Sequence, residues 1–154
     1  MKKLILIMAL LVIPVSYSNA EIVKIIANDK YDIYIDGDAI DISEYPMVQL
    51  DYYMRFNNSP ESINYRREQY DFVPFPDNIK TIIVDTYFYC EDTELYRIMT
   101  FKVYDANKYI LKSLTPNEYF TIGKNTIASE IHSIVCPNWK KTWKNLKNNI
   151  YYMK

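Results

Sequence analysis

Two cysteines, Cys90 and Cys136, constrain the fold of this chain more than any other feature, because each ends a segment with a regular pattern. Residues 79–90 read IKTIIVDTYFYC, and from Ile82 to Cys90 every second residue belongs to one largely apolar strand face. Residues 126–136 read TIASEIHSIVC and carry an apolar stripe at helical spacing. A helix this short is not stable alone, so we expect its stripe to pack on the side of the sheet that Cys90 faces.

Residues 1–20 have the three-part pattern of a cleaved secretory signal peptide. Two lysines are followed by an apolar run, and small residues occupy the −3 and −1 positions before Glu21. A membrane anchor is the less favoured alternative, because the apolar run is short. No lipobox cysteine follows the run, and no membrane span is expected in the mature chain.

Export determines how the two cysteines are interpreted. In an oxidising compartment a pair of cysteines indicates a disulfide rather than a metal or catalytic site. We therefore predict a bond between Cys90 and Cys136.

Short β-prone segments separated by turn residues make up most of the mature chain. Residues 57–78 contain several Asn and Pro residues and many charges, so a long exposed loop is expected there. The predicted strands are 21–29, 31–36, 47–56, 79–90, 93–104 and 109–114. The fold class is therefore α+β: an antiparallel sheet of about six strands, with the C-terminal helix packed on one face and tethered by the disulfide.

The residues that carry chemistry are sparse. The single histidine, His132, is expected at the surface or boundary of the helix, and two glycines exclude a glycine-rich phosphate loop. Four aspartates around Gly37 faintly resemble a calcium loop, but no glutamate closes it, so an Asp-rich turn is preferred: Asp32, Asp36, Asp38 and Asp41. No catalytic constellation can be assembled, so we expect no enzymatic activity, no cofactor and no metal.

Tyrosine is unusually frequent, with 16 residues in 154. Several tyrosines lie on the polar faces of predicted strands, among them Tyr53, Tyr87 and Tyr89. Two explanations stay open: β-propensity alone, or a surface that contacts another protein, where Tyr and Arg are enriched.

Charge is distributed unevenly. Residues 21–137 hold all 19 acidic groups and 11 basic ones, whereas the chain from residue 138 onward has five lysines and no acid. That basic segment has apolar residues at helical spacing, and its candidate binding surface comprises Trp139, Lys140, Lys141, Trp143, Lys144 and Lys147. It either packs on the acidic domain or binds an anionic membrane or a partner.

The order of segments across residues 22–137 resembles the surface-adhesin E (adhesin protein E-like) family of Gram-negative bacteria. The residues that carry the resemblance are Tyr34-Ile35-Asp36, Cys90 after a Tyr/Phe-rich strand, the Tyr104-Asp105 turn and Cys136 at the end of the helix. The resemblance implies an antiparallel sheet with a disulfide-tethered helix and no enzymatic activity. The founding members are outer-membrane lipoproteins that bind host laminin, vitronectin and plasminogen. This chain departs from them in having no lipobox cysteine and about 17 residues after Cys136.

The sequence thus predicts a signal peptide (1–20), a surface-adhesin E-like domain (21–137) and a basic amphipathic extension (138–154). The expected function is that of an exported, non-enzymatic, adhesin-like protein that binds host matrix or serum proteins. The alternatives are a periplasmic inhibitor or immunity-type protein, or an envelope-associated structural protein. No nucleic-acid partner is expected, and a homodimer and the choice between periplasm, outer surface and secretion stay open.

Overall fold

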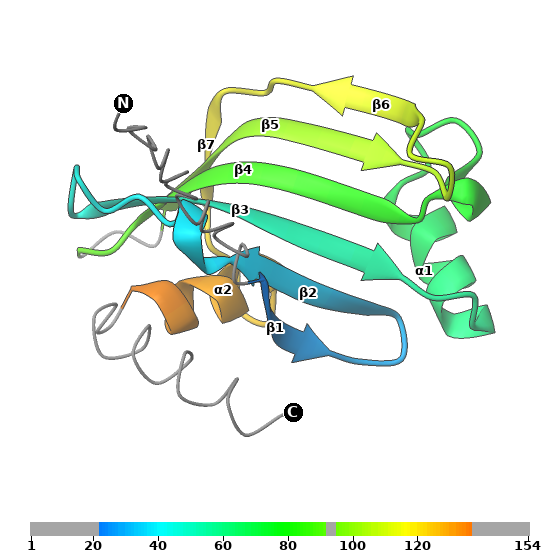
Figure 1. Ribbon diagram of the computed structural model, residues 1–154, viewed down its shortest axis with the longest axis horizontal. Coiled ribbons are helices and arrows are strands. Elements are labelled where there is room, and N and C mark those ends of the chain that lie inside the picture. The colour runs from blue at the N-terminus through cyan, green and yellow to red at the C-terminus, as the bar shows by residue number, and fades with distance from the viewer. Residues whose placement is uncertain (1–21, 92–94, 137–154) are drawn as a thin grey trace, which may run out of the picture.

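The structure, a computed structural model, describes residues 22–91 and 95–136 (Figure 1). Within these residues the elements are β1 (Ile22–Ala27), β2 (Tyr31–Asp36), β3 (Met47–Phe56), α1 (Pro60–Gln69), β4 (Thr81–Tyr89), β5 (Leu95–Tyr104), β6 (Ile110–Leu114), β7 (Glu118–Thr121) and α2 (Ile127–Val135). Two short 3-10 helices, η1 (Gly37–Ala39) and η2 (Pro76–Asn78), complete them. The strands form one antiparallel sheet in the order β1-β2-β3-β4-β5-β6, and β7 pairs with the first half of β5.

The core lies on one face of this sheet and follows from strict alternation along the central strands. In β3 and β4 every second residue is buried, from Val48 to Phe56 and from Ile82 to Phe88. Because side chains of period two share one face, this alternation gives each strand one core face and one polar face. The six predicted strands are confirmed as β1 to β6.

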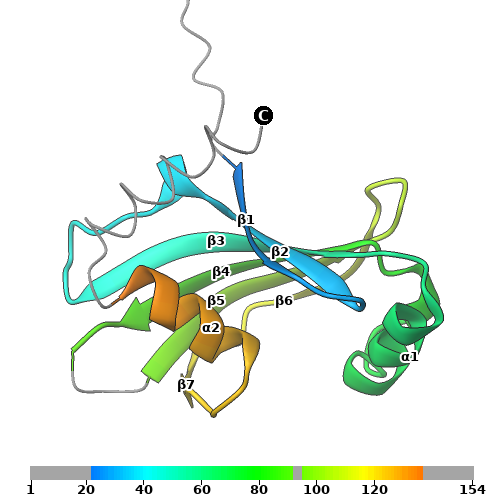
Figure 2. The ribbon, with the colours of Figure 1, turned by 90° about the horizontal axis from the view of Figure 1, so that it is seen from below.

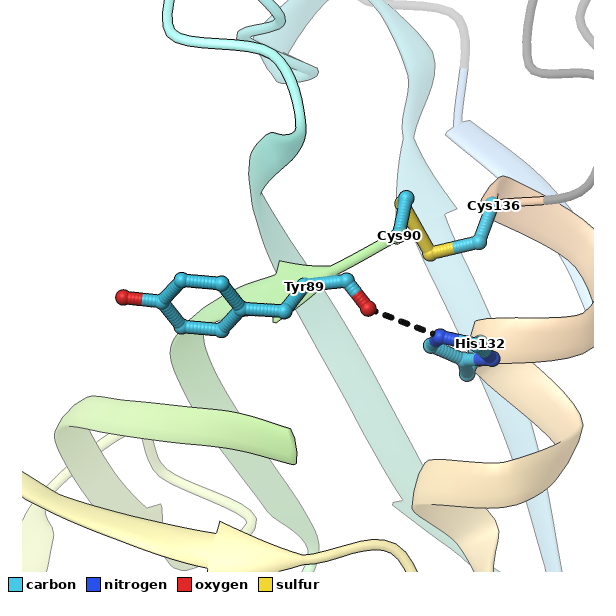
Figure 3. The surroundings of a disulfide bond; sticks show 4 residues. All are labelled: Tyr89, Cys90, His132 and Cys136. Carbon is cyan, nitrogen blue, oxygen red and sulfur yellow. Dashed lines mark hydrogen bonds between the residues drawn. A yellow bond between two sulfur atoms is a disulfide. The ribbon is translucent and has the colours of Figure 1, made fainter. Parts of the chain in front are cut away.

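Helix α2 packs on the core face, as its apolar stripe predicts. Ile131 is fully buried, and a capping box between Thr126 and Ser129 begins the helix. At the other end Cys136 forms the predicted disulfide with Cys90, just after β4 (Figure 3). The α+β fold class with a tethered C-terminal helix is thereby confirmed.

The prediction of a loop throughout residues 57–78 is wrong, because this segment contains α1 and η2. Ser59 caps α1 by accepting a hydrogen bond from the Ser62 amide, and Pro60 occupies the first turn, where its missing N–H costs nothing. The buried face of α1 consists of Ser62 and Arg66 rather than apolar residues. Hydrophobic periodicity therefore gives no sign of this helix.

The connection expected between the last hairpin and the helix contains a seventh strand, β7, so the prediction of about six strands is one too few. Residues 118–121 pair with residues 95–98 of β5, whereas β6 pairs with residues 101–104 of the same strand. Four residues are too few for a visible alternation.

The described residues contain no helix that is long and apolar enough to cross a membrane. The predicted signal peptide lies outside these residues, as do Glu21 and the basic extension.

A candidate protein-contact face on the sheet

Both α-helices lie on the same side of the sheet, so the opposite face of its central strands is covered by neither (Figure 2). We call this opposite side the helix-free face. It is defined by the residues that alternate with the core, including Tyr34, Tyr53, Tyr87, Tyr89 and Tyr119. These tyrosines come from four different strands, β2, β3, β4 and β7.

Strand pairing gathers two of these tyrosines into a row near the β1 edge. Tyr34 stands opposite Lys24 on one side and Tyr53 on the other. The Lys24 ammonium lies 5.3 Å from the Tyr34 ring centroid, and the Arg55 guanidinium lies 4.8 Å from it. Both distances fall within cation–π range. One aromatic ring is therefore held between two cations.

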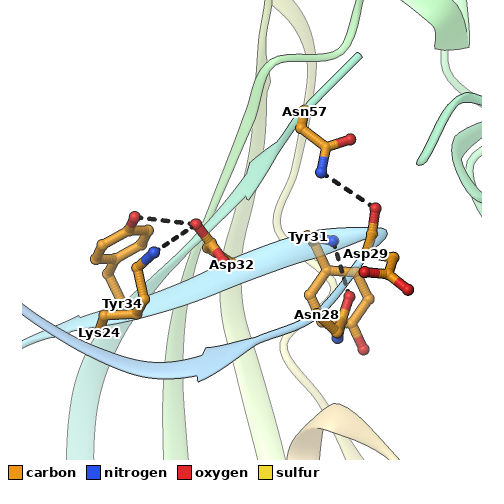
Figure 4. A network of polar contacts seen from close by, with 7 residues as sticks. All are labelled: Lys24, Asn28, Asp29, Tyr31, Asp32, Tyr34 and Asn57. Carbon is orange, nitrogen blue, oxygen red and sulfur yellow. Dashed lines mark hydrogen bonds and ion pairs between the residues drawn. The ribbon is translucent and has the colours of Figure 1, made fainter. Parts of the chain in front are cut away.

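Asp32 fixes this row from below (Figure 4). Its carboxylate accepts a hydrogen bond from Lys24 Nζ at 2.7 Å and another from the Tyr34 hydroxyl at 3.3 Å. Because the carboxylate binds both groups, the lysine and the tyrosine ring are held in one arrangement.

A second row crosses β3, β4, β5 and β7. Gln49 pairs with Tyr87, Tyr87 with Arg97, and Arg97 with Tyr119. A bulge in β5 makes this row possible: Asp85 pairs with Thr100, but the next residue of β4 pairs with Ile98. The extra residue turns Arg97 onto the face that Thr100 also occupies.

Arg97 is locked in place at the end of this row. Its guanidinium lies 5.1 Å from the Tyr119 ring centroid, and its Nη2 donates a hydrogen bond to Asn117 Oδ1. The hydroxyls of Tyr119 and Tyr89 lie 3.3 Å apart. The hydrogen bond to Tyr119 and partial desolvation raise the pKa of Tyr89. This end of the face thus combines two tyrosines with a stacked arginine.

Two aspartates meet between the rows. Asp51 and Asp85 stand directly opposite each other on β3 and β4. Gln49 Nε2 donates a hydrogen bond to Asp85 at 3.1 Å. Burial raises the pKa of Asp51, and the negative charges of Asp85 and Asp36 raise it further. Like charges directly opposite each other destabilise a sheet, so this pair does not serve stability.

The remaining sequence candidates have structural positions that differ from this face. Asp36 caps η1 by accepting a hydrogen bond from the Asp38 amide, and Asp41 accepts one from the Ser43 amide. These are cap and turn roles, as the Asp-rich turn interpretation expects. Within residues 22–91 and 95–136, no group of three or more His, Cys, Asp or Glu side chains could hold a metal ion.

His132 lies at the boundary between α2 and the sheet rather than on the helix-free face (Figure 3). Its Nε2 lies 3.0 Å from the Tyr89 carbonyl oxygen, and its ring is 6.0 Å from the ring of Phe88. Since a carbonyl only accepts, the Nε2 atom must carry the hydrogen. The half-buried histidine helps to hold the helix beside the disulfide.

Sequence reasoning found part of this face. Tyr53, Tyr87 and Tyr89 were expected on polar strand faces, and the structure places all three on one surface. Tyr119 and Arg97 were missed, because β7 and the β5 bulge were not anticipated. The candidate surface from Trp139 to Lys147 lies outside the described residues.

No protein-family model matches the sequence, and a search of curated proteins finds no significant match. Among solved structures, the chain is similar to Protein E from non-typeable Haemophilus influenzae. The two share 15% sequence identity at a TM-score of 0.47, and the match covers 92% of this chain and 94% of that chain. A likeness at this level assigns neither a family nor a function.

Proposed function

We propose that this protein is an exported, non-enzymatic, adhesin-like binding protein whose helix-free face contacts another protein. One observation carries the proposal: neither α-helix covers this face, and on it tyrosines from four strands stand beside stacked arginines. Tyr and Arg dominate the energetics of protein interfaces, since they combine apolar area with hydrogen-bonding capacity.

The charges of this face specify the chemistry of the partner. Asp51 and Asp85 occupy its centre, while Lys24, Arg55 and Arg97 lie toward its edges. A complementary protein surface has basic residues at its centre. Its binding is expected to weaken at high salt, because exposed charge pairs are screened.

The resemblance to the surface-adhesin E family supplies the partner class, host matrix and serum proteins. Membership of that family is part of the proposal. A signal-peptide pattern and a disulfide both agree with export. Cell fractionation tests the location: a surface or culture-supernatant location supports adhesion, and strict periplasmic retention contradicts it.

The binding test uses the full mature protein and immobilised laminin, vitronectin and plasminogen. Tyr87→Ala and Tyr119→Ala should each weaken binding about 10-fold or more, since truncated interface tyrosines commonly cost more than 1 kcal/mol. Tyr109→Ala is the matched control, because Tyr109 is an exposed tyrosine before β6, outside the helix-free face. Melting temperatures identify any variant that fails through loss of folding. Binding that all three variants retain, or that none of the three proteins shows, contradicts the proposal.

The basic extension forms a separate part of the proposal, as a surface for an anionic membrane or an acidic partner. Deleting residues 139–154 should then remove salt-sensitive co-sedimentation with anionic liposomes and leave the melting temperature nearly unchanged. A truncated protein that is destabilised but binds as before supports packing on the domain instead.

A further inference from the structure

The connection between α1 and η2 displays an aromatic residue far from the helix-free face. We call residues 72–76 the Phe75 loop; it lies at the α1 end of the sheet, away from α2 (Figures 1 and 2). Phe75 is 71% exposed. Phe72 is only half-exposed, because its ring packs on those of Phe101 and Tyr70, each 6.2 Å away. The loop therefore has one aromatic anchored in the fold and one directed to solvent.

The backbone of Phe75 is held in an unfavourable conformation. Its φ is 56° and its ψ is 63°, the left-handed region that glycine or asparagine normally occupies. The residue also precedes Pro76, and a residue before proline prefers extended backbone. Both preferences are overridden at this position. Strain of this kind persists only where the surrounding structure enforces it, and it is concentrated at functional sites.

The surrounding structure does enforce it, because both ends of the loop are fixed. Val73 and Ile79 are buried, and the amide of Asn78 donates a hydrogen bond to the Phe75 carbonyl at 2.9 Å. Behind η2, Arg67 binds the Asp77 carboxylate through two hydrogen bonds of 2.7 and 2.6 Å.

A buried arginine supports the same segment from inside. Arg66 is 1% exposed, and its guanidinium donates hydrogen bonds to the carbonyls of Asn57 and Asp77 and to Ser62 Oγ. One side chain thus joins α1, the end of β3 and η2. The loop is rigid at its base, with prolines on both sides of its exposed tip.

We propose that the Phe75 loop is a second contact site, which inserts the Phe75 ring into an apolar pocket of a protein partner. A ring that is already fixed in place loses little conformational entropy on binding, so its burial adds efficiently to affinity. This is the way in which a rigid loop occludes a partner's pocket, and it goes beyond adhesion through the helix-free face.

The chemistry around the loop favours a protein over a lipid surface. The exposed Asp71 and Asp77 flank the tip, and negative charges are repelled by anionic lipid headgroups. A single phenylalanine also offers little area for membrane binding. A concave apolar pocket, by contrast, buries one ring completely.

Photo-crosslinking from the full mature chain tests the site. A photoreactive amino acid replaces Asp71, which leaves Phe75 intact, and the protein is irradiated in the producing bacterium's envelope extract and in host serum. The captured protein is identified by mass spectrometry, purified, and its affinity measured by calorimetry. Phe75→Ala should weaken binding at least about 10-fold, as loss of a buried phenylalanine ring implies. Phe75→Leu should retain part of the affinity, and Tyr109→Ala should retain all of it.

Phe75→Gly separates contact from folding. Glycine adopts left-handed backbone freely, so its melting temperature should match or exceed that of Phe75→Ala, while binding is lost equally. The proposal is overturned if no protein is captured, or if Phe75→Ala binds the captured protein as the wild type does. It is overturned also if Phe75→Ala reduces only liposome co-sedimentation, which would make the site a lipid contact. Loss of binding in the Tyr87→Ala variant alone would instead report on the helix-free face.

Discussion

Removing the disulfide should cost this protein a large share of its stability. Cys90 and Cys136 are 46 residues apart in the sequence, and the bond joins the end of β4 to the end of α2. For a closed loop of this length, the chain-entropy model gives about 4 kcal/mol of stabilisation, mainly through restriction of the unfolded chain. Small domains have about 5–15 kcal/mol in total, so a variant without the bond remains folded with a reduced margin.

The assay is equilibrium urea unfolding of the oxidised protein and of the double variant Cys90→Ala/Cys136→Ala, followed by circular dichroism. Ser133→Ala, an exposed change on the same helix, is the control and should shift the free energy of unfolding by no more than about 0.5 kcal/mol. Because Ile131 and Val135 still pack on the sheet, the double variant should keep its helix signal in water. A loss of under about 1 kcal/mol would refute the reasoning, since the tether would then add almost nothing to α2 packing.

Three further changes test other parts of the account. Ile131→Asp should unfold the protein at a temperature far below that of Glu130→Ala, because it buries an unpaired carboxylate at a fully buried position; equal melting temperatures would contradict the packing of α2. Folding raises the pKa of Asp51, so the folded state holds its proton to a higher pH than the unfolded chain and stability falls as pH rises through that pKa. Asp51→Asn should therefore raise the free energy of unfolding at neutral pH by about 0.2–1 kcal/mol, and the gain should vanish in acid; denaturation at several pH values checks the sign. Arg66→Met should lower the free energy of unfolding by about 1–3 kcal/mol, because it leaves buried carbonyls unpaired, and an unchanged urea midpoint would contradict this role.

The parts of the fold that sequence predicts are those in which apolar spacing decides the structure. The alternation in residues 47–56 gives β3 with its observed bounds, and the stripe through Ile131 gives α2. The disulfide follows from a pair of cysteines in an exported chain, and it ties these two patterns together.

The missed elements are held by polar contacts. The buried face of α1 is Ser62 and Arg66, whose partners are backbone carbonyls of distant residues. No spacing rule reveals such partners. A capping signal was nevertheless present, because Ser59 followed by Pro60 is typical of a helix start.

The candidate contact face is predictable only in part, for a related reason. Alternation places Tyr53 and Tyr87 on polar faces, but the rows across the sheet depend on strand register and on the β5 bulge. A shift of one residue would send Arg97 to the other side of the sheet, away from Tyr119. The bulge leaves no pattern in the sequence that fixes its position.

Radical footprinting of the tyrosines tests the central claim most directly. The full mature protein is oxidised alone and in complex with whichever of laminin, vitronectin or plasminogen it binds, and the modification of each tyrosine is measured by mass spectrometry. The account predicts strong protection of Tyr53, Tyr87, Tyr89 and Tyr119 in the complex, with Tyr109 oxidised equally in both states. Unchanged oxidation of the four tyrosines on the helix-free face, in a complex shown to be saturated, would contradict it.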